Sequence, residues 1–310
     1  MVPFSLSERS WELATRMPWG EAQERELDAE LARRYGNVSA LSRRLQGWTR
    51  DRPRAEVLTD LGLDLGKKTA VVFSHILWDA NMFYGEDLFA DQEEWFVETV
   101  RAAVENPRVN WIVKLHPANV WKLRREGLGG ELDEERAIAE GIGPLPAHVA
   151  VLRPESEIST RSVFEAADYG ITIRGSVGFE LPCLGVPVLT AGTGFYAGRG
   201  FTVDSATTGE YLARLSRIEE ILPPTAEQVE LARRHAYALF RLRPLRFSSF
   251  VATIRPLPEM GHPLDHDVEL SVRTRKELEA ADDLRRFADW ALGSTELDYL
   301  RRDVPTSGTG

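Results

Sequence analysis

Between residues 69 and 190, short apolar runs alternate with stretches of helical character, and this alternation is the feature that most constrains the fold. The apolar runs lie at 69–73, 110–116, 148–152, 169–173 and 187–191. The intervening stretches predict helices around 91–105, at 159–167 and from about Ser176 onward. Short apolar strands separated by helices are typical of a parallel sheet covered on both faces. The sequence therefore predicts an α/β fold with one doubly wound, Rossmann-like domain.

The predicted sheet domain spans residues 67–241, and the segments on either side of it read differently. Residues 1–66 are rich in Arg and Glu and predict a helical lead-in and linker. Residues 242–310 predict a loop, C-terminal helices and a disordered tail. Outside the alternating region, helices are expected at 21–35, 37–47, 208–221, 225–241 and 275–291.

The charge and the cysteine content limit which binding partners and which cellular compartment are expected. The 310 residues carry 38 basic and 48 acidic side chains, a net charge of −10, and neither end is a basic arm, so nucleic-acid binding has little electrostatic support. Cys183 is the single cysteine, which indicates a reducing, cytoplasmic setting. The longest nearly apolar stretch, 181–189, is too short to span a membrane, and the first residues do not resemble a secretory signal. Peripheral association with the inner membrane stays open.

The turn after the 169–173 strand is the first candidate site, because ligands of open parallel sheets bind outside the carboxyl ends of the strands. Ser176 is expected to cap the following helix, and the first amides of that helix form a positive end that suits phosphate. Glu180 falls on the same helical face, where its carboxylate can accept hydrogen bonds from a ribose. An ordinary capped helix is the alternative. The amides concerned belong to Gly175, Ser176, Val177 and Gly178.

The KLHP segment at 114–117 ends the second predicted strand and is the second candidate site. Lys114 and His116 share a face of the strand, whereas Leu115 points to the other. An imidazole at the carboxyl edge of the sheet can donate a proton or a hydrogen bond to a phosphate oxygen. A histidine bonded within its own loop is the alternative.

A glycine-rich loop at 191–201 follows the last predicted strand. Its backbone can approach a ligand closely, and Arg199 can add positive charge to a phosphate site. A purely structural loop is the alternative, since the glycine spacing matches neither Walker nor dinucleotide motifs.

The loop at 74–87 follows the first predicted strand and carries aromatic and acidic side chains. Trp78 and Tyr84 can stack on a sugar or base, Asp79 can act as a base, and His75 is a further candidate. Ordinary packing of the aromatic rings is the alternative. His and Asp residues cluster at 261–267, and incidental polar residues of a surface loop explain this cluster better than a metal site does. No metal or cofactor is expected.

Taken in order, these segments resemble the capsule polysaccharide biosynthesis family, bacterial GT-B sugar transferases related to enzymes that add Kdo. The resemblance covers residues 69–205 and rests on SHILWDA, EEWFVETVR, WIVKLHPAN, RPESEIST and ITIRGSVGFELPCLGVPVLTAGTGFYAGRGFTVD in that order. It implies a nucleotide-sugar donor bound to this domain, with His116 and Lys114 at the phosphate, and Ser176 and Glu180 at phosphate and ribose. It also implies a glycan or glycolipid acceptor.

We therefore expect a metal-independent glycosyltransferase, and Asp79 is the candidate for the residue that activates the acceptor hydroxyl. The chain resembles only the C-terminal, donor-binding half of a GT-B enzyme. This leaves two arrangements for sugar transfer: a second chain or another copy supplies the acceptor half, or Asp79 or another residue of this chain serves as the base. Two alternatives stay open: an enzyme like the nucleotide-sugar 2-epimerases, and a non-catalytic nucleotide-binding subunit.

Overall fold

The computed structural model describes residues 5–35, 49–77, 88–117, 119, 131–192, 194–255, 265–295 and 298–300. The chain forms two compact units, one built mainly from Ala32–Ala236 and the other from Leu6–Leu31 and Tyr237–Gly310. Each unit is described by itself.

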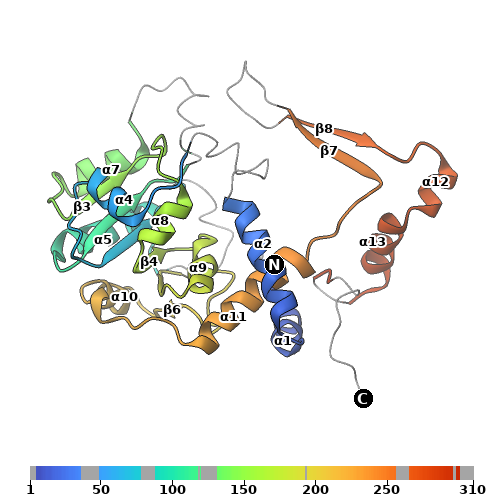
Figure 1. Ribbon diagram of the computed structural model, residues 1–310, viewed down its shortest axis with the longest axis horizontal. Coiled ribbons are helices and arrows are strands. Elements are labelled where there is room, and N and C mark those ends of the chain that lie inside the picture. Colours follow the sequence, from blue (N-terminus) through green and yellow to red (C-terminus); the bar gives the residue numbers. More distant parts are fainter. Residues whose placement is uncertain are drawn as a thin grey trace. The chain divides into compact units, whose positions relative to one another are not determined.

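The first unit is organised around a six-stranded parallel sheet in the order β3-β2-β1-β4-β5-β6 (Figure 1). From the central β1 the chain winds outward through β2 and β3, then returns to β4 beside β1 and winds the other way. This reversal makes the sheet doubly wound and confirms the predicted fold class. The strands are β1 (Thr69–Phe73), β2 (Asn110–Lys114), β3 (Val149–Leu152), β4 (Tyr169–Thr172), β5 (Val188–Thr190) and β6 (Val203–Asp204).

Helices cover both faces of the sheet, because alternate strand residues point to opposite sides. Ala70 and Val72 join one core and Val71 and Phe73 the other. The first core is completed by α5 (Gln92–Glu105), α7 (Asp133–Gly141) and α10 (Thr208–Leu215). The second is completed by α4 (Arg54–Asp60), α8 (Thr160–Ala166) and the turn after α9 (Val177–Glu180).

The five predicted strands are all present, each within a few residues of its expected bounds. The short β6 and the helix α7 were not anticipated, and the predicted helix at 208–221 is α10 followed by a 3₁₀ turn, Ile218–Glu220. The predicted helix at 225–241 is α11 (Ala226–Tyr237), continued by a π-helical turn, Ala238–Leu242. The expected helix at 37–47 and the tail lie outside the described residues.

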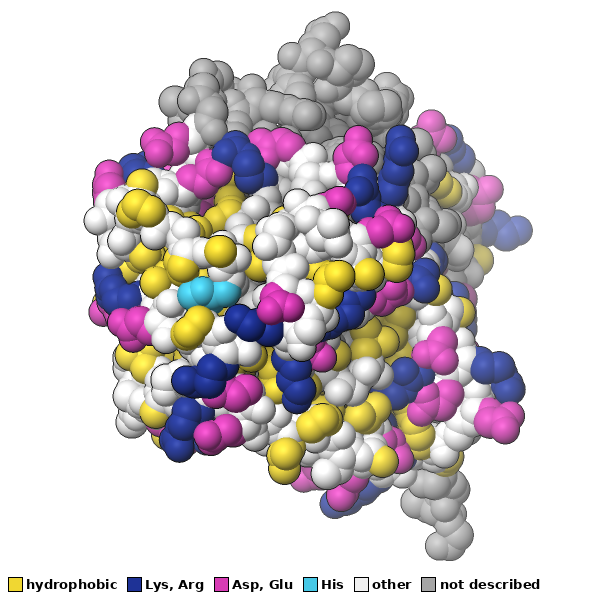
Figure 2. Space-filling model, turned by 60° about the vertical axis from the view of Figure 1, so that its left-hand side comes forward, with side chains coloured by type: hydrophobic (Ala, Val, Ile, Leu, Met, Phe, Trp, Pro, Cys, Tyr) yellow, Lys and Arg dark blue, Asp and Glu magenta, His cyan; other side chains and the backbone are white. Residues whose placement is uncertain are grey.

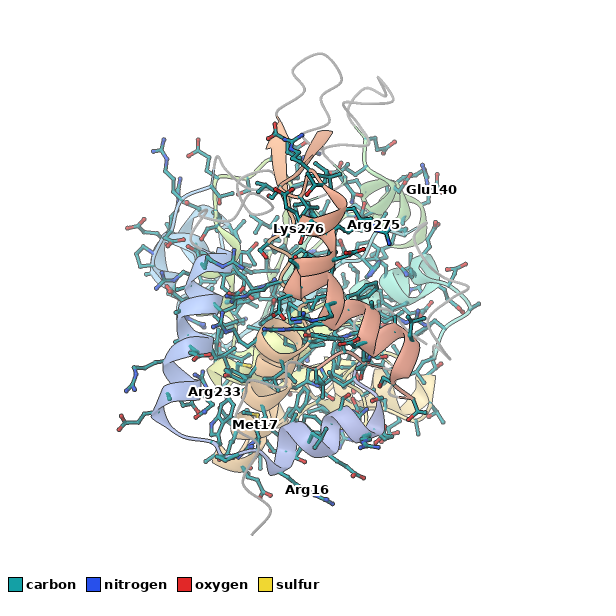
Figure 3. The ribbon with its side chains drawn as sticks, turned by 90° about the vertical axis from the view of Figure 1, so that its right-hand side faces the viewer. Arg16, Met17, Glu140, Arg233, Arg275 and Lys276 are labelled. Atoms are coloured by element: carbon teal, nitrogen blue, oxygen red, sulfur yellow. The ribbon has the colours of Figure 1, made fainter. Side chains whose placement is uncertain are left out.

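The second unit contains α1 (Glu8–Arg16), most of α2 (Glu21–Tyr35) and the π-helical turn. Glu26 on α2 accepts hydrogen bonds from the Tyr237 hydroxyl at 3.0 Å and from the Arg241 guanidinium at 3.3 Å. Figure 3 shows Arg16 and Met17 at the end of α1.

A β-hairpin in the second unit corrects the prediction that 242–310 holds only a loop and helices. β7 (Phe250–Arg255) pairs antiparallel with β8 (Asp265–Leu270). The predicted helix at 275–291 is broken at Ala281 into α12 (Arg275–Ala280) and α13 (Asp282–Gly293). Figure 3 labels Arg275 and Lys276 in the first turn of α12. No helix among the described residues has the length and apolar character needed to cross a membrane.

Candidate functional site

The carboxyl ends of β1 and β4 lie side by side at the point where the winding of the sheet reverses. In a doubly wound sheet this reversal opens the crevice that binds ligands. Ser74 and His75 follow β1, and the 173–176 turn follows β4. Two of the predicted segments therefore meet at the crevice, and the KLHP segment lies next to it at the end of β2.

Lys114 is the last residue of β2, and its side chain is only 7% exposed. Burial lowers the pKa of its ammonium group to about 8. Among the described residues no carboxylate lies within ion-pair range of it, and Leu115 joins the core on the opposite face, as the strand alternation predicts. The site therefore holds a buried cation that no acidic side chain of the described part of the chain neutralises.

His116 lies two residues beyond Lys114, and its ring centroid is 6.2 Å from that of His75. Burial lowers the pKa of His116 to about 3, with further contributions from His75 and Lys114. At neutral pH the imidazole is uncharged, so it offers one ring N–H as a hydrogen-bond donor rather than a labile proton.

A buried carboxylate that the sequence analysis missed joins the ends of β1 and β2. Glu134, in the first turn of α7, is 1% exposed. Its Oε1 accepts a hydrogen bond from the Ser74 hydroxyl at 3.1 Å and another from the Asn119 side-chain amide. Burial raises the pKa of Glu134, and hydrogen bonds that include these two partly offset that rise.

The turn after β4 offers fewer amides than predicted. The Gly175 N–H donates to the Thr172 hydroxyl at 3.0 Å, and the Gly178 N–H donates to the Gly175 carbonyl at 2.9 Å. Among the described residues, no acceptor lies within hydrogen-bond range of the Ser176 and Val177 amides. Two of the four predicted donors are therefore available to a ligand.

Ser176 occupies the N-cap position of α9, as predicted, but its hydroxyl does not cap the helix. Ser176 has helical backbone angles and makes no side-chain cap hydrogen bond. Its hydroxyl instead donates to Glu180 Oε2 at 3.2 Å. Because the backbone is already helical at Ser176, the hydroxyl is not placed to accept from the amides of the first helical turn as a capping hydroxyl does, and the Gly178 and Phe179 amides donate to backbone carbonyls instead.

Glu180 is 4% exposed, and Ser176 is not its only neighbour. The Arg34 guanidinium, at the end of α2, lies 3.4 Å from Oε1, and the Tyr35 hydroxyl lies close enough for this carboxylate to affect its pKa. Burial raises the pKa of Tyr35, and the charge of Glu180 raises it further. A ribose that reached this carboxylate would have to compete with these donors.

The 191–201 loop packs beneath the turn through Tyr196, whose hydroxyl donates to the Gly175 carbonyl at 2.9 Å. Arg199 lies farther along this loop, and its charge helps burial to lower the pKa of His235 to about 3. His235, on α11, is fully buried among aromatic rings that include Phe179 and Phe201. Arg199 thus stands close enough to His235 to affect its titration.

The other predicted site residues, Trp78, Asp79 and Tyr84, lie outside the described residues. His116 and the Ser176 turn are separated by β1, and two strand spacings amount to about 10 Å. The imidazole and the free amides are therefore placed to contact different parts of one ligand.

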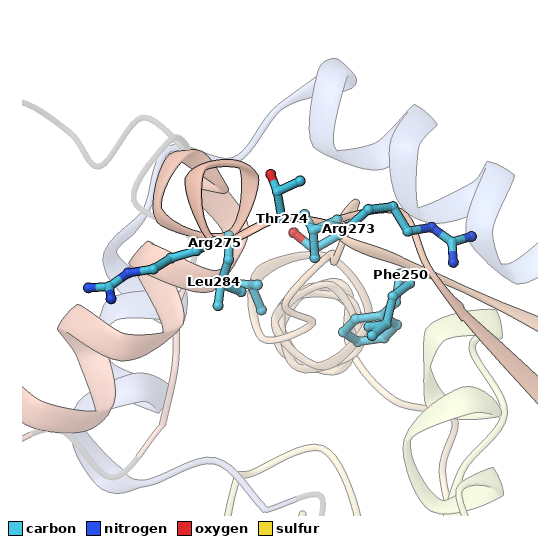
Figure 4. Close-up of a pocket in the computed structure, with 9 residues that line it drawn as sticks. Phe250, Arg273, Thr274, Arg275 and Leu284 are labelled. Atoms are coloured by element: carbon cyan, nitrogen blue, oxygen red, sulfur yellow. The ribbon is translucent and has the colours of Figure 1, made fainter.

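A cavity of about 450 Å³ lies in the second unit rather than at the sheet (Figure 4). Its walls include Phe250, Leu278 and Leu284, and the side chains of Arg273 and Arg275 extend away from each other. The two hydroxyls in its wall already have partners, because Ser249 donates to Asp283 and Thr274 caps α12. The cavity is apolar and offers no evident chemistry.

The surface of the first unit carries both signs of charge. Figure 2 shows acidic and basic side chains interspersed, with apolar groups between them. On the face in view, the side chains of the described residues form no continuous basic surface.

No family model and no curated protein matches the chain. Solved structures similar to it include KpsC of Thermosulfurimonas dismutans as a beta Kdo 2,4 transferase, at 18% identity and a TM-score of 0.38, over 74% of this chain and 60% of that one. The beta Kdo 2,7 transferase of the same organism matches at 20% identity and a TM-score of 0.35, over 75% and 60%.

A UDP-N-acetylglucosamine 2-epimerase matches at 18% identity and a TM-score of 0.37, over 64% of this chain and 46% of that one. The chain is only distantly similar to these three structures and spans 60% or less of the length of each. Matches at such TM-scores and identities assign it neither activity nor substrate.

Proposed function

We propose that the carboxyl edge of the sheet binds the phosphate of a nucleotide sugar and that the chain is the donor-binding part of a glycosyltransferase. The observation that carries the proposal is Lys114, a buried cation without an acidic partner among the described residues. A buried charge is costly unless it is neutralised, so the position favours an anionic ligand.

The neighbouring groups supply what a departing nucleotide phosphate requires. The Lys114 ammonium offsets its negative charge, and the neutral His116 imidazole donates a hydrogen bond to an oxygen. The Ser176 and Val177 amides, at the end of the strand beside β1, are placed to contact a second part of the ligand. Arg199, on the 191–201 loop, is proposed to add further positive charge at the phosphate.

Glu180 is proposed to accept hydrogen bonds from the ribose in exchange for its present donors. The carboxylate has two oxygens and several lone pairs, so Ser176 can keep Oε2 while a ribose hydroxyl takes the place of Arg34 at Oε1. Asp79, Trp78 and Tyr84 keep their proposed roles as acceptor base and stacking groups. The acceptor is proposed to be a glycan or glycolipid.

Binding is tested with the unmodified chain by calorimetry against CMP, UDP, GDP and dTDP and their sugars. Lys114→Gln and His116→Ala should each lower the affinity for the nucleotide that binds by about tenfold or more. This is the scale of a lost charge-assisted hydrogen bond. Lys68→Gln is the matched control, because Lys68 precedes β1 at the opposite edge of the sheet and bonds Tyr169. No binding by any of these ligands would overturn the proposal.

Catalysis is tested separately, by adding glycan acceptors to the donor that binds. Transfer of the sugar supports the full proposal. Conversion of the donor into an isomer without acceptor would instead identify an epimerase, and binding with neither reaction would identify a binding subunit.

A further inference from the structure

The segment that carries Lys114 and His116 is fixed at both ends by backbone hydrogen bonds from two polar residues. The Ser74 N–H donates to the Lys114 carbonyl at 3.0 Å. The Asn119 N–H donates to the His116 carbonyl at 3.0 Å and closes the turn that contains Pro117. The backbone positions of Ser74 and Asn119 therefore set where this segment lies.

The side chains of these same two residues meet at one carboxylate oxygen. Glu134 Oε1 accepts from the Ser74 hydroxyl and from the Asn119 amide. Ser74 directly follows β1, Asn119 lies in the segment after β2, and Glu134 belongs to α7. One buried side chain thus ties three segments together around the residues proposed to contact phosphate.

Burial makes this arrangement costly to break. A carboxylate that is 1% exposed has lost its hydration and depends on the hydrogen bonds it receives. A carboxylate that accepts two hydrogen bonds at one oxygen also fixes the separation of the two donors. An apolar residue would fill the space without fixing that separation.

We infer that Glu134 is a positioning residue: by holding Ser74 and Asn119 on one oxygen, it sets the positions of Lys114 and His116 for an anionic ligand. The inference rests on the proposed function for the ligand. The placement of the imidazole does not depend on it, so the two can be tested apart.

The first measurement uses no ligand. Two-dimensional ¹⁵N spectra of the imidazoles, with His116 assigned from the His116→Ala variant, report the environment and tautomer of the ring. Glu134→Ala should shift the His116 signals. Glu134→Gln should restore them, because its amide oxygen can accept from the same two donors. Glu140→Ala is the control, since Glu140 lies on the same helix with an exposed side chain (Figure 3).

The second measurement is calorimetry with the nucleotide that the unmodified chain binds. Glu134→Ala should weaken its affinity at least about tenfold, as expected when a binding group is misplaced without being removed. Glu134→Gln and Glu140→Ala should stay close to the unmodified chain. If Glu134 were merely structural, Glu134→Ala would change the unfolding temperature but would alter neither the His116 signals nor the nucleotide affinity.

The inference is overturned if folded Glu134→Ala leaves the His116 signals unchanged. If Glu134→Ala does not fold, Ser74→Ala decides the matter, because it deletes one of the two hydrogen bonds, and unchanged His116 signals in that variant overturn the inference equally. If the unmodified chain binds no nucleotide while the His116 signals shift and Gln restores them, the proposed function fails and the positioning role stands.

Discussion

Gly178 and Tyr196 approach each other so closely that no side chain fits between them. A β-carbon at Gly178 would lie 2.0 Å from Cζ of Tyr196. Tyr196 is fully buried and its hydroxyl holds the Gly175 carbonyl, so the ring has little freedom to move aside. The tyrosine supports the turn whose amides face the crevice.

Gly178→Ala should therefore cost about 1–3 kcal/mol of unfolding free energy, the usual range for overpacking a core. Urea denaturation followed by fluorescence measures the loss. Gly209→Ala is the control, because a β-carbon there would meet only Thr207 Oγ1 at 4.0 Å. A loss at Gly178 no larger than at Gly209 would contradict this account of the contact.

Tyr211→Phe should destabilise the first unit by about 1–3 kcal/mol, since it leaves a buried donor unsatisfied. The Trp95 indole N–H donates to the Tyr211 hydroxyl at 2.9 Å, and the Thr99 hydroxyl lies 2.8 Å from it. Denaturation of the variant gives the loss. Tyr169→Phe should cost less, because the Tyr169 hydroxyl accepts from the exposed Lys68 and donates to the Glu219 carbonyl in a part-buried position. Equal losses would argue against the role of burial.

Stability should fall as the pH drops below about 6.5, because His235 is buried in its neutral form. Its pKa is lowered to about 3 in the folded chain, whereas an unfolded histidine titrates near 6.5. The penalty is absent above about pH 6.5 and grows by up to about 1.4 kcal/mol per pH unit as the pH falls towards 3.

Denaturation at pH 7, 6 and 5 measures that slope. His116 contributes in the same direction, since its pKa is also lowered to about 3. His235→Phe should reduce the slope of stability against pH by up to the contribution of one titrating proton. The slope that remains should include the contribution of His116. An unchanged slope in this variant would rule out His235 as a source.

Nucleotide affinity should fall as the pH rises above about 8. The pKa of Lys114 is lowered to about 8 by burial, and a bound phosphate would raise it again by favouring the charged form. Above about pH 8 the free chain must therefore take up a proton to bind, and affinity drops by up to tenfold per pH unit. Calorimetry in buffers of different ionisation enthalpy detects that proton, and Lys114→Gln should abolish it.

The sheet could be predicted because its strands are buried on both faces. Runs such as TAVVF at 69–73 and YGITI at 169–173 are apolar throughout, which is readable without knowledge of their neighbours. The two-residue β6 and the β7–β8 hairpin escaped prediction. β6 is too short to carry a pattern, and the segment joining β7 to β8 is longer than the turns that identify a hairpin.

The site could be predicted only where its residues follow a strand directly. The positions of Lys114 and His116 at the edge of the sheet could be predicted from the alternation of side chains along β2 and from Pro117 after it. Glu134 could not be found in this way, because its partners at 74 and 119 are distant in sequence and its charge is typical of an exposed first helical turn. Ser176 was correctly expected at the N-cap position, but its capping hydrogen bond was wrong, because the backbone is already helical at that residue.

The residues around the crevice come from segments that lie far apart in the sequence, near residues 74, 116, 134 and 176. None of these segments holds its place without the sheet, so a ligand that engages them is bound by the native unit and not by the denatured chain. Binding would then raise the melting temperature in proportion to the logarithm of ligand concentration. A cleavage between β2 and β4 that let the fragments separate would abolish binding while leaving every contacting residue chemically intact.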